Sequence, residues 1–402
     1  MILTFFACAE ILVAKIEQVR GFRLSQQEVK YLALLIMCET DYDGPADYLL
    51  QTEFENLREN AAYAFDVVRR RIGADMPGKG VPQELIHHMH RMLLRSRMHF
   101  SVYDPVSDLM QSRSSYLYDC CAWVMTQMIE TYKIQPSSGE VAFLALRLSM
   151  YLPAFLIAEP PVTAVLICPD FGTTGTILAE RIKEKFSPRL RLAACINHVN
   201  LEELPSAELY LSVLPPGSRR RSVQITPFLI ESDCALVSRE LSRIERLWAR
   251  DFLTAYLECY SGPQFFETSE GFSSREAAVR HICSRLEKKK IVDPGFPDLI
   301  LRREYAADTV AYQEVAIPHA CTSGVRKNTI YILKSKTPIP WGEKSVKMVI
   351  FMALERFLLE DFRYLYCLLL CFLNYLKSLA GFVAAESFSM LMEQLSNFPA
   401  DY

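Results

Sequence analysis

Three of the chain's seven histidines lie together in residues 85–95, a segment with the apolar period of a helix. On this helix His88, Arg91 and Arg95 recur on one face, apart from the apolar stripe. A neutral imidazole nitrogen is a nucleophile near pH 7, and neighbouring guanidinium groups stabilise an arriving phosphoryl group. The segment therefore fits a phosphoryl acceptor at His88, and it also fits a solvated or capped helix histidine.

Cys168 is the second candidate, at the end of a predicted strand over residues 162–168 and before a Gly–Thr-rich turn. Backbone N–H groups at such a strand-to-helix turn point at an anion and can lower the pKa of a thiol. A phosphatase would have an arginine six residues after the cysteine, where Thr174 stands. The loop therefore favours a thiol that carries phosphate, with a retained but unreactive fold as the alternative.

His319 is the third candidate and follows a proline at the end of the strand-like residues 314–319. The proline fixes the backbone in front of the ring, so we expect the imidazole to be presented where the strand ends. A Pro–His pair by itself also fits a satisfied structural histidine.

The composition that surrounds these residues is that of an ordinary globular protein, with 402 residues, 50% hydrophobic, 23% charged and a net charge of -3. The length predicts about two to four domains, and the charge provides no broad surface for nucleic acid. Twelve cysteines without a CxxC pair argue against a zinc site and a disulfide framework, and favour a reducing cytoplasm. The N-terminus is not a convincing signal peptide, and the most apolar run, residues 364–376, is too short for a bilayer and is predicted to be a buried helix.

Helical units come first along the chain. Residues 6–37 have a helical period, with a capping box at Ser25–Glu28. The same capping-box pattern recurs 112 residues later at Ser137–Glu140. The helices predicted near 11–20 and 123–132 also correspond, so we predict two copies of one helical unit. About 60 further residues precede the second copy and only about ten the first, so we expect the chain to be the C-terminal portion of a longer architecture.

Two units with strands follow. After Pro160–Pro161, strands predicted at 162–168, 190–194 and 209–214 alternate with helices, which indicates a small parallel sheet. The last unit follows a linker and has the pattern of an α+β mixed sheet with flanking helices. Its predicted strands lie at 314–319, 328–333 and 346–351, and its closing helices at about 357–376 and 385–396.

The helical residues 54–152 resemble the PTS regulation domain (PRD), an all-α bundle of bacterial regulators controlled by the sugar phosphotransferase system (PTS). The matching residues are Leu85–His88 with Arg95, Tyr103–Pro105 and Glu140–Leu146. The resemblance implies that His88 accepts phosphate, and Arg91 and Arg95 are its predicted supporting residues. Arg147 and Leu35 stand where the family has histidines, which implies reduced or altered regulation.

The other two units also resemble PTS domains. Residues 168–176 and 227–233 resemble enzyme IIB, which implies phosphate on Cys168. The C-terminal unit resembles the mannitol/fructose-type enzyme IIA, and the matching residues are Arg303, Glu304, Thr309, Ala316–His319 and Trp341. This resemblance implies that His319 takes phosphate from the phosphocarrier HPr, with Arg303, Glu304 and Thr309 lining or supporting the site. Tyr312 and Glu314 replace family glycines, which implies a slower or blocked reaction.

Together these resemblances predict a multidomain protein with a partial first PRD at 1–45, a second PRD at 50–157, an α/β enzyme IIB-like domain at 161–256 and an α+β enzyme IIA-like domain at 262–402. The order resembles transcriptional regulators of the mannitol-operon activator and lichenan-operon type. It implies a cytoplasmic homodimer that HPr and enzyme II components phosphorylate. It also implies no cofactor, no metal, no membrane insertion, and DNA binding only through an N-terminal domain that this chain does not contain. The alternatives are a soluble IIA–IIB phosphocarrier and a degenerate dimerisation module that is not phosphorylated.

Overall fold

A computed structural model describes residues 2–39, 48–72, 81–97, 99, 104, 106–151, 161–169, 173–197, 205–215, 222–311, 314–322, 324–355, 359–373 and 376–396. Its contacts divide the chain into two units. Unit 1 comprises Met1–Leu152 with Arg302–Ala307, and unit 2 comprises Pro153–Leu301 with Asp308–Tyr402. Each unit is described by itself.

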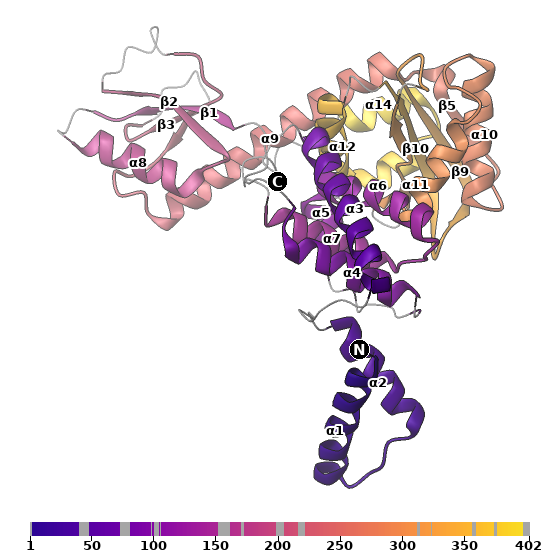
Figure 1. The fold of residues 1–402 in the computed structure, drawn as a ribbon. Coiled ribbons are helices and arrows are strands. Elements are labelled where there is room, and N and C mark those ends of the chain that lie inside the picture. Colours follow the sequence, from indigo (N-terminus) through magenta and orange to yellow (C-terminus); the bar gives the residue numbers. More distant parts are fainter. Residues whose placement is uncertain are drawn as a thin grey trace. The chain divides into compact units, whose positions relative to one another are not determined.

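Unit 1 is built from helices (Figure 1). They are α1 (Ile2–Arg20), α2 (Gln26–Glu39), α3 (Tyr48–Ile72), α4 (Gln83–Arg97), α5 (Ser107–Arg113), α6 (Ser115–Tyr132) and α7 (Ser138–Ser149). Helix α1 pairs with α2, while α3, α4, α5, α6 and α7 pack on one another around a core of fully buried Leu57, Leu85, Met89 and Leu144. The apolar stripe predicted for residues 85–95 thus forms the buried side of α4.

The two-copy repeat is visible in the helix boundaries. Helix α6 ends and α7 begins at Tyr132 and Ser138, each 112 residues after the end of α1 and the start of α2. The first capping box forms as predicted, since the Ser25 amide donates to Glu28 Oε2 at 2.6 Å and the Glu28 amide donates to Ser25 Oγ at 3.3 Å.

The second predicted capping box is wrong. Ser137 stands at the start of α7 without a side-chain capping bond, and its hydroxyl is among the buried polar atoms without a partner in the described part of the chain. The Glu140 carboxylate accepts hydrogen bonds from Arg95 instead, at 2.7 and 2.9 Å. A buried bidentate ion pair is a stronger interaction than a hydrogen bond to one backbone amide, which explains why the carboxylate turns to Arg95.

The first part of unit 2 is an α/β layer with a parallel sheet in the order β2-β1-β3-β4. Its elements are β1 (Val162–Ile167), α8 (Thr174–Phe186), β2 (Leu190–Ile196), β3 (Leu209–Ser212), β4 (Ser222–Gln224) and α9 (Glu231–Tyr260). Leu166 of the sheet, Ile182 of α8 and Leu241 of α9 share one core, so both helices cover the same face. The predicted parallel sheet is confirmed, and β4 is a further strand that the sequence pattern did not reveal.

The second part of unit 2 is a mixed sheet in the order β5-β9-β10-β7-β6, with β8 paired to β10 (Figure 1). The strands are β5 (Phe266–Ser269), β6 (Val310–Ala311), β7 (Val315–Ala316), β8 (His319–Cys321), β9 (Thr329–Trp341) and β10 (Lys344–Leu354). The helices are α10 (Arg275–Lys288), α11 (Phe296–Ala306), α12 (Leu359–Leu373), α13 (Leu376–Ala384) and α14 (Phe388–Ser396). Helix α11 begins in unit 2, and its residues from Arg302 onward belong to unit 1. Strands β9 and β10 are antiparallel, whereas β5, β7 and β8 pair in parallel with their neighbours β9 and β10, so the predicted mixed sheet is confirmed.

Helix α9 belongs to the cores of both parts of unit 2. Val237 and Leu241 pack on the parallel sheet. Leu253 and Leu257 line, with Met352 of β10, a small apolar gap beneath α12. The predicted domain end at residue 256 therefore falls inside a continuous 30-residue helix.

The described part of the chain contains no helix that is both long enough and apolar enough to traverse a lipid bilayer. The apolar run at 364–376 includes most of α12, whose Leu365, Leu368 and Leu369 are buried. Its prediction as a buried helix is confirmed.

Candidate functional site

His319 opens β8, and its backbone surroundings define which ring nitrogen is reactive. Nδ1 lies 2.8 Å from the carbonyl oxygen of Ile317. Because a carbonyl oxygen only accepts hydrogen bonds, Nδ1 carries the proton of the neutral ring and Nε2 carries the lone pair. The Ile317 amide donates to the Thr309 carbonyl at 3.1 Å and to Thr309 Oγ1 at 3.2 Å. Thr309 thus holds the peptide that orients His319.

Helix α12 covers the His319 ring. The ring centroids of Phe362 and Tyr366 lie 4.8 and 4.9 Å from that of His319, and His319 is 1% exposed. The sequence suggested a ring presented at the end of a strand, and the structure instead buries it. The physical reason is the apolar run of α12, which must bury its own aromatic side chains and does so over the end of β8.

Arg303 and Glu304 are both buried in α11. Within unit 1, Arg303 Nε and Nη2 donate to Asp119 Oδ1 at 3.0 and 2.7 Å, and Nη1 donates to the Ala307 carbonyl at 2.6 Å. The guanidinium charge is therefore neutralised by a fully buried carboxylate. Sequence reasoning missed Asp119, although a lone acid inside the apolar residues 115–128 was a signal, because a buried charge requires a partner.

His88 lies on α4 and is 5% exposed. Its Nε2 atom is buried and has no hydrogen-bond partner in the described ranges. Burial lowers the pKa of His88 to about 3, assisted by the positive charges of Arg95, Arg147 and Arg91. The imidazole is therefore neutral at pH 7, with a buried lone pair or N–H group in surroundings that favour an anion.

Cys168 follows β1 and is buried in the core that Leu166 and Leu178 share. Burial raises the pKa of its thiol, and the neighbouring Cys195 raises it further. The sequence-based expectation of a lowered pKa is therefore not met in this structure. The side chain faces apolar atoms on the α8 side of the sheet, and desolvation disfavours a thiolate there.

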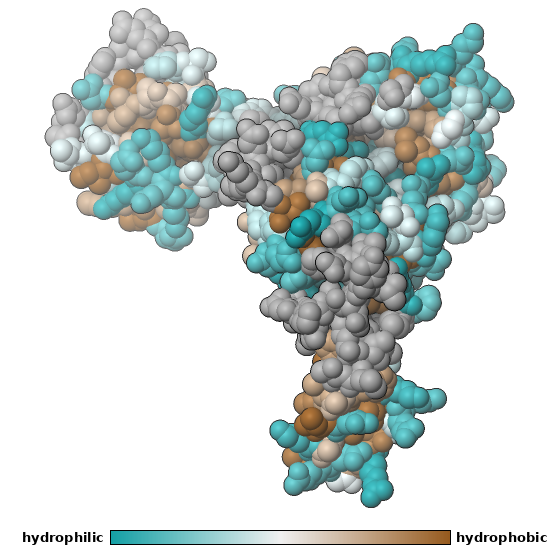
Figure 2. All heavy atoms as spheres, viewed as in Figure 1, coloured by the Kyte–Doolittle hydropathy of each residue, from teal (hydrophilic) through white to brown (hydrophobic). Residues whose placement is uncertain are grey.

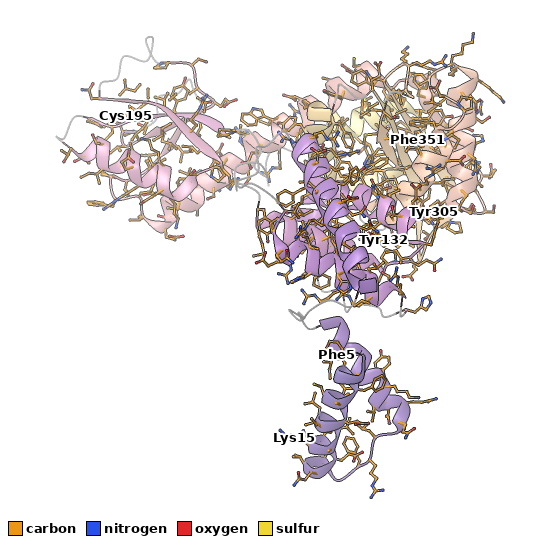
Figure 3. The ribbon with its side chains drawn as sticks, in the orientation of Figure 1. Phe5, Lys15, Tyr132, Cys195, Tyr305 and Phe351 are labelled. Carbon is orange, nitrogen blue, oxygen red and sulfur yellow. The ribbon has the colours of Figure 1, made fainter. Side chains whose placement is uncertain are left out.

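A second thiol, which sequence reasoning missed, lies next to Cys168. Cys195 pairs with Leu166 across β2 and β1, and Figure 3 labels it on this sheet. A Cβ atom on Gly175, at the start of α8, would lie 3.5 Å from Cys195 Sγ and 3.9 Å from Cys168 Sγ. Glycine therefore lets the helix start approach both sulfur atoms.

The structure thus brings together His88, Arg91 and Arg95 in unit 1, and Thr309 with His319 in unit 2. Over the described residues, no cluster of three or more His, Cys, Asp or Glu side chains could hold a metal ion. The predicted segment Tyr103–Pro105 falls mostly outside the described residues, and Tyr312 lies outside them.

Residues 263–395 match the family model of the phosphoenolpyruvate-dependent sugar phosphotransferase system, EIIA 2. Two solved structures similar to this part are IIA mannitol from Escherichia coli and the nitrogen regulatory protein IIA-Ntr from Neisseria meningitidis. The first is 19% identical and covers 33% of this chain and 97% of its own, with a TM-score of 0.30. The second is 16% identical and covers 34% of this chain and 97% of its own, with a TM-score of 0.32.

Two curated proteins of Bacillus subtilis (strain 168) are similar along most of the chain. The transcriptional regulator ManR is 23% identical over 363 residues, which are 87% of this chain and 54% of ManR. The protein named "Probable licABCH operon regulator" is 18% identical over 370 residues, which are 90% of this chain and 56% of that protein. The chain spans about half the length of these relatives. It is thus similar to a transcriptional regulator and to a probable operon regulator, and its C-terminal third matches a PTS EIIA type 2 domain.

Proposed function

We propose that this chain is the regulatory portion of a bacterial transcriptional regulator that works in the cytoplasm and is controlled by PTS phosphorylation. The observation that carries the proposal is the match of residues 263–395 to a PTS EIIA domain inside a chain similar over 87–90% of its length to operon regulators. HPr and sugar-specific enzyme II components are the proposed phosphoryl donors. Phosphate on the chain then reports how fast sugar is being taken up.

His319 is the first proposed acceptor. Its Nδ1–H is held by Ile317, which leaves Nε2 to attack phosphorus. The bond from phosphorus to the donor's imidazole breaks as the bond to Nε2 forms. The donor, protonated on its other ring nitrogen, leaves as neutral imidazole, and His319 keeps its Nδ1 proton as the cationic phosphoimidazole.

Transfer to His319 also needs movement of α12, because Phe362 and Tyr366 lie on the ring. The phosphoryl group carries about 1.5 to 2 negative charges beside a protonated ring, and the cost of burying these charges disfavours return of the two aromatic side chains. Phosphorylation of His319 is thereby converted into a displacement of α12.

His88 is the second proposed acceptor. A phosphoryl group on Nε2 would lie among the positive charges of Arg91, Arg95 and Arg147 that lower the imidazole pKa. It would compete with Glu140 for Arg95, which now donates two hydrogen bonds to that carboxylate. Because Arg95 joins α4 to α7, this competition would loosen the contact between the two helices.

Cys168 is the third proposed acceptor, with the raised pKa of its thiol as an obstacle. A second candidate function, a module that is not phosphorylated, is favoured by the same observations. His88 and His319 are buried, and Cys168 lies in an apolar core. The test must therefore distinguish a slow acceptor from an inert one.

The experiment incubates the full chain with enzyme I, HPr and phosphoenolpyruvate, and locates phosphate by mass spectrometry under conditions that preserve phosphohistidine. His319→Ala, His88→Ala and Cys168→Ser variants assign each label. Label on His88 or His319 supports the regulator. Label that passes from Cys168 to a sugar would favour a soluble IIA–IIB carrier, and absence of label from all three residues would favour the inert module.

A further inference from the structure

One ion pair sets the register between α4 and α7. Arg95, near the end of α4, donates two hydrogen bonds to Glu140, near the start of α7. His88 lies seven residues before Arg95, and Arg147 lies seven residues after Glu140. Seven residues make about two helical turns, so each step stays on the same helix face and covers about 10 Å along the axis. If the two helices are antiparallel, His88 and Arg147 therefore lie opposite each other.

Electrostatic effects on two side chains show this antiparallel arrangement. Burial lowers the pKa of His88, and the charge of Arg147 contributes to the shift. Burial also raises the pKa of Tyr151, four residues after Arg147, and the charge of Glu84, four residues before His88, raises it further. The farther a residue lies before Arg95 on α4, the farther its neighbour lies after Glu140. His88 and Arg147 are therefore neighbours across the two helices.

The side chains of His88 and Arg147 have no acidic partner among the residues that the structure describes. His88 is 5% exposed, and its Nε2 atom is buried without a hydrogen-bond partner. Arg147 is half-buried, and its guanidinium group makes no hydrogen bond or ion pair within the described ranges. A buried polar atom without a partner destabilises a folded protein, and a bound ion supplies such a partner.

The charges around His88 favour an anion that carries more than one negative charge. The guanidinium groups of Arg95, Arg147 and Arg91 all act on His88 with positive charge. The Glu140 carboxylate is held by Arg95 through both of its oxygens. A phosphate dianion has acceptor oxygens for the forked N–H groups of an arginine and for an imidazole N–H at the same time.

We infer that His88 and Arg147 bind a free phosphate dianion between α4 and α7, either inorganic phosphate or the phosphate of a small monoester. The neutral His88 ring donates from Nε2–H, and Arg147 donates from two of its N–H groups. Figure 2 shows hydrophilic residues over much of the visible surface of the α3–α7 bundle. Because Arg147 is half-buried, the anion reaches the site from solvent along its guanidinium group.

This inference goes beyond the proposed phosphorylation, because no bond to His88 forms and no phosphoryl donor takes part. A covalent phosphoryl group requires the lone pair of Nε2, whereas a bound phosphate requires a proton on the same atom. The two states of His88 therefore exclude each other, and a bound phosphate would compete with phosphorylation of this histidine.

The experiment titrates the full chain with inorganic phosphate by isothermal titration calorimetry, at constant ionic strength and without enzyme I, HPr or phosphoenolpyruvate. We expect saturable binding of one phosphate per chain, weakened tenfold or more by Arg147→Gln. The matched control is Arg58→Gln. Arg58 is an exposed arginine of α3 that is not among the charges acting on His88, so this variant should leave the affinity within twofold.

Two variants of His88 test the imidazole. Leucine removes the polar atom, whereas glutamine keeps a side-chain N–H donor. We expect His88→Leu to weaken phosphate binding tenfold or more and His88→Gln to restore most of the affinity. Arg147→Lys keeps the charge without the forked N–H groups and should bind phosphate with intermediate affinity. Circular dichroism should show the same helix content in all variants.

Two further probes identify the ligand. Acetate carries a single charge and should bind at least tenfold more weakly than phosphate. Methyl phosphate bound as tightly as inorganic phosphate would assign a monoester, and much weaker binding of methyl phosphate would assign the free ion. No saturable phosphate binding, equal losses in Arg147→Gln and Arg58→Gln, or equal affinity for acetate would overturn the inference. Failure of the proposed phosphorylation would leave these results unchanged, since no phosphoryl donor is present.

Discussion

The Arg95–Glu140 pair shows how one residue contact determines the stability of the α4–α7 packing. Both side chains are nearly fully buried and meet through two short hydrogen bonds. Removal of one member leaves an uncompensated buried charge. We therefore expect Glu140→Ala to lower the free energy of unfolding by about 3 to 5 kcal/mol. Urea unfolding followed by circular dichroism measures this loss. The control is Glu180→Ala, which removes an exposed ion pair with Lys183 and should lower the free energy of unfolding by at most about 1 kcal/mol.

The lowered pKa of the buried His88 imidazole leads us to expect a loss of folding stability in acid. Its folded pKa is about 3, whereas the unfolded imidazole titrates near 6.5. The unfolded chain therefore binds more protons between these values, so His88 stabilises the fold above pH 6.5 and this stability is lost as the pH falls toward 3. Across the whole range between the two pKa values, the free energy of unfolding falls by on the order of 5 kcal/mol. The urea midpoint of the wild-type chain should fall more steeply over this range than that of His88→Leu. Equal slopes would contradict the lowered pKa.

At the scale of elements, α12 is predicted to control access to His319. Diethylpyrocarbonate modifies the unprotonated nitrogen of an accessible imidazole, and here Phe362 lies against the ring. Phe362→Ala should therefore speed modification of His319 tenfold or more, as measured by peptide mass spectrometry. Tyr364→Ala is the matched control. Tyr364 also lies on α12, but its ring packs on Phe252 of α9, with the two ring centroids 4.5 Å apart. Similar rates in both variants would mean that general loosening of α12, rather than the ring contact, exposes the histidine.

Elements with a strong local pattern could be predicted from sequence. The apolar period and capping residues of residues 6–37 predicted α1 and α2, and β-branched runs predicted the first part of β9 and the middle of β10. Strand β4 has three residues, too few to show an alternation. Arg303 and Asp119 are 184 residues apart in the chain, so no local pattern could reveal their pairing. Likewise, the sequence located Cys168 at a strand end, but only the packed sheet shows that its thiol faces the core.

At the scale of the whole molecule, α9 couples the two sheets of unit 2. From Leu241 to Leu257 the helix runs roughly 24 Å at 1.5 Å per residue, with one sheet packed near each end. Since both cores share this rigid element, we expect them to unfold together. A proline at Leu247, between the two packing sites, removes a helix hydrogen bond at a cost of about 3 kcal/mol and separates the cores.

The measurement is hydrogen exchange by mass spectrometry on peptides from β1 and β10 across a urea series. In the wild-type chain both peptides should lose protection at the same urea concentration, and in Leu247→Pro at two different concentrations. Leu247→Ala is the control, because it removes the same side chain while keeping the helix backbone, and should leave the two transitions together. Separate transitions already in the wild-type chain would mean that α9 bends or frays between the sheets. In that case a phosphoryl group on one sheet domain could not be sensed by the other through this helix.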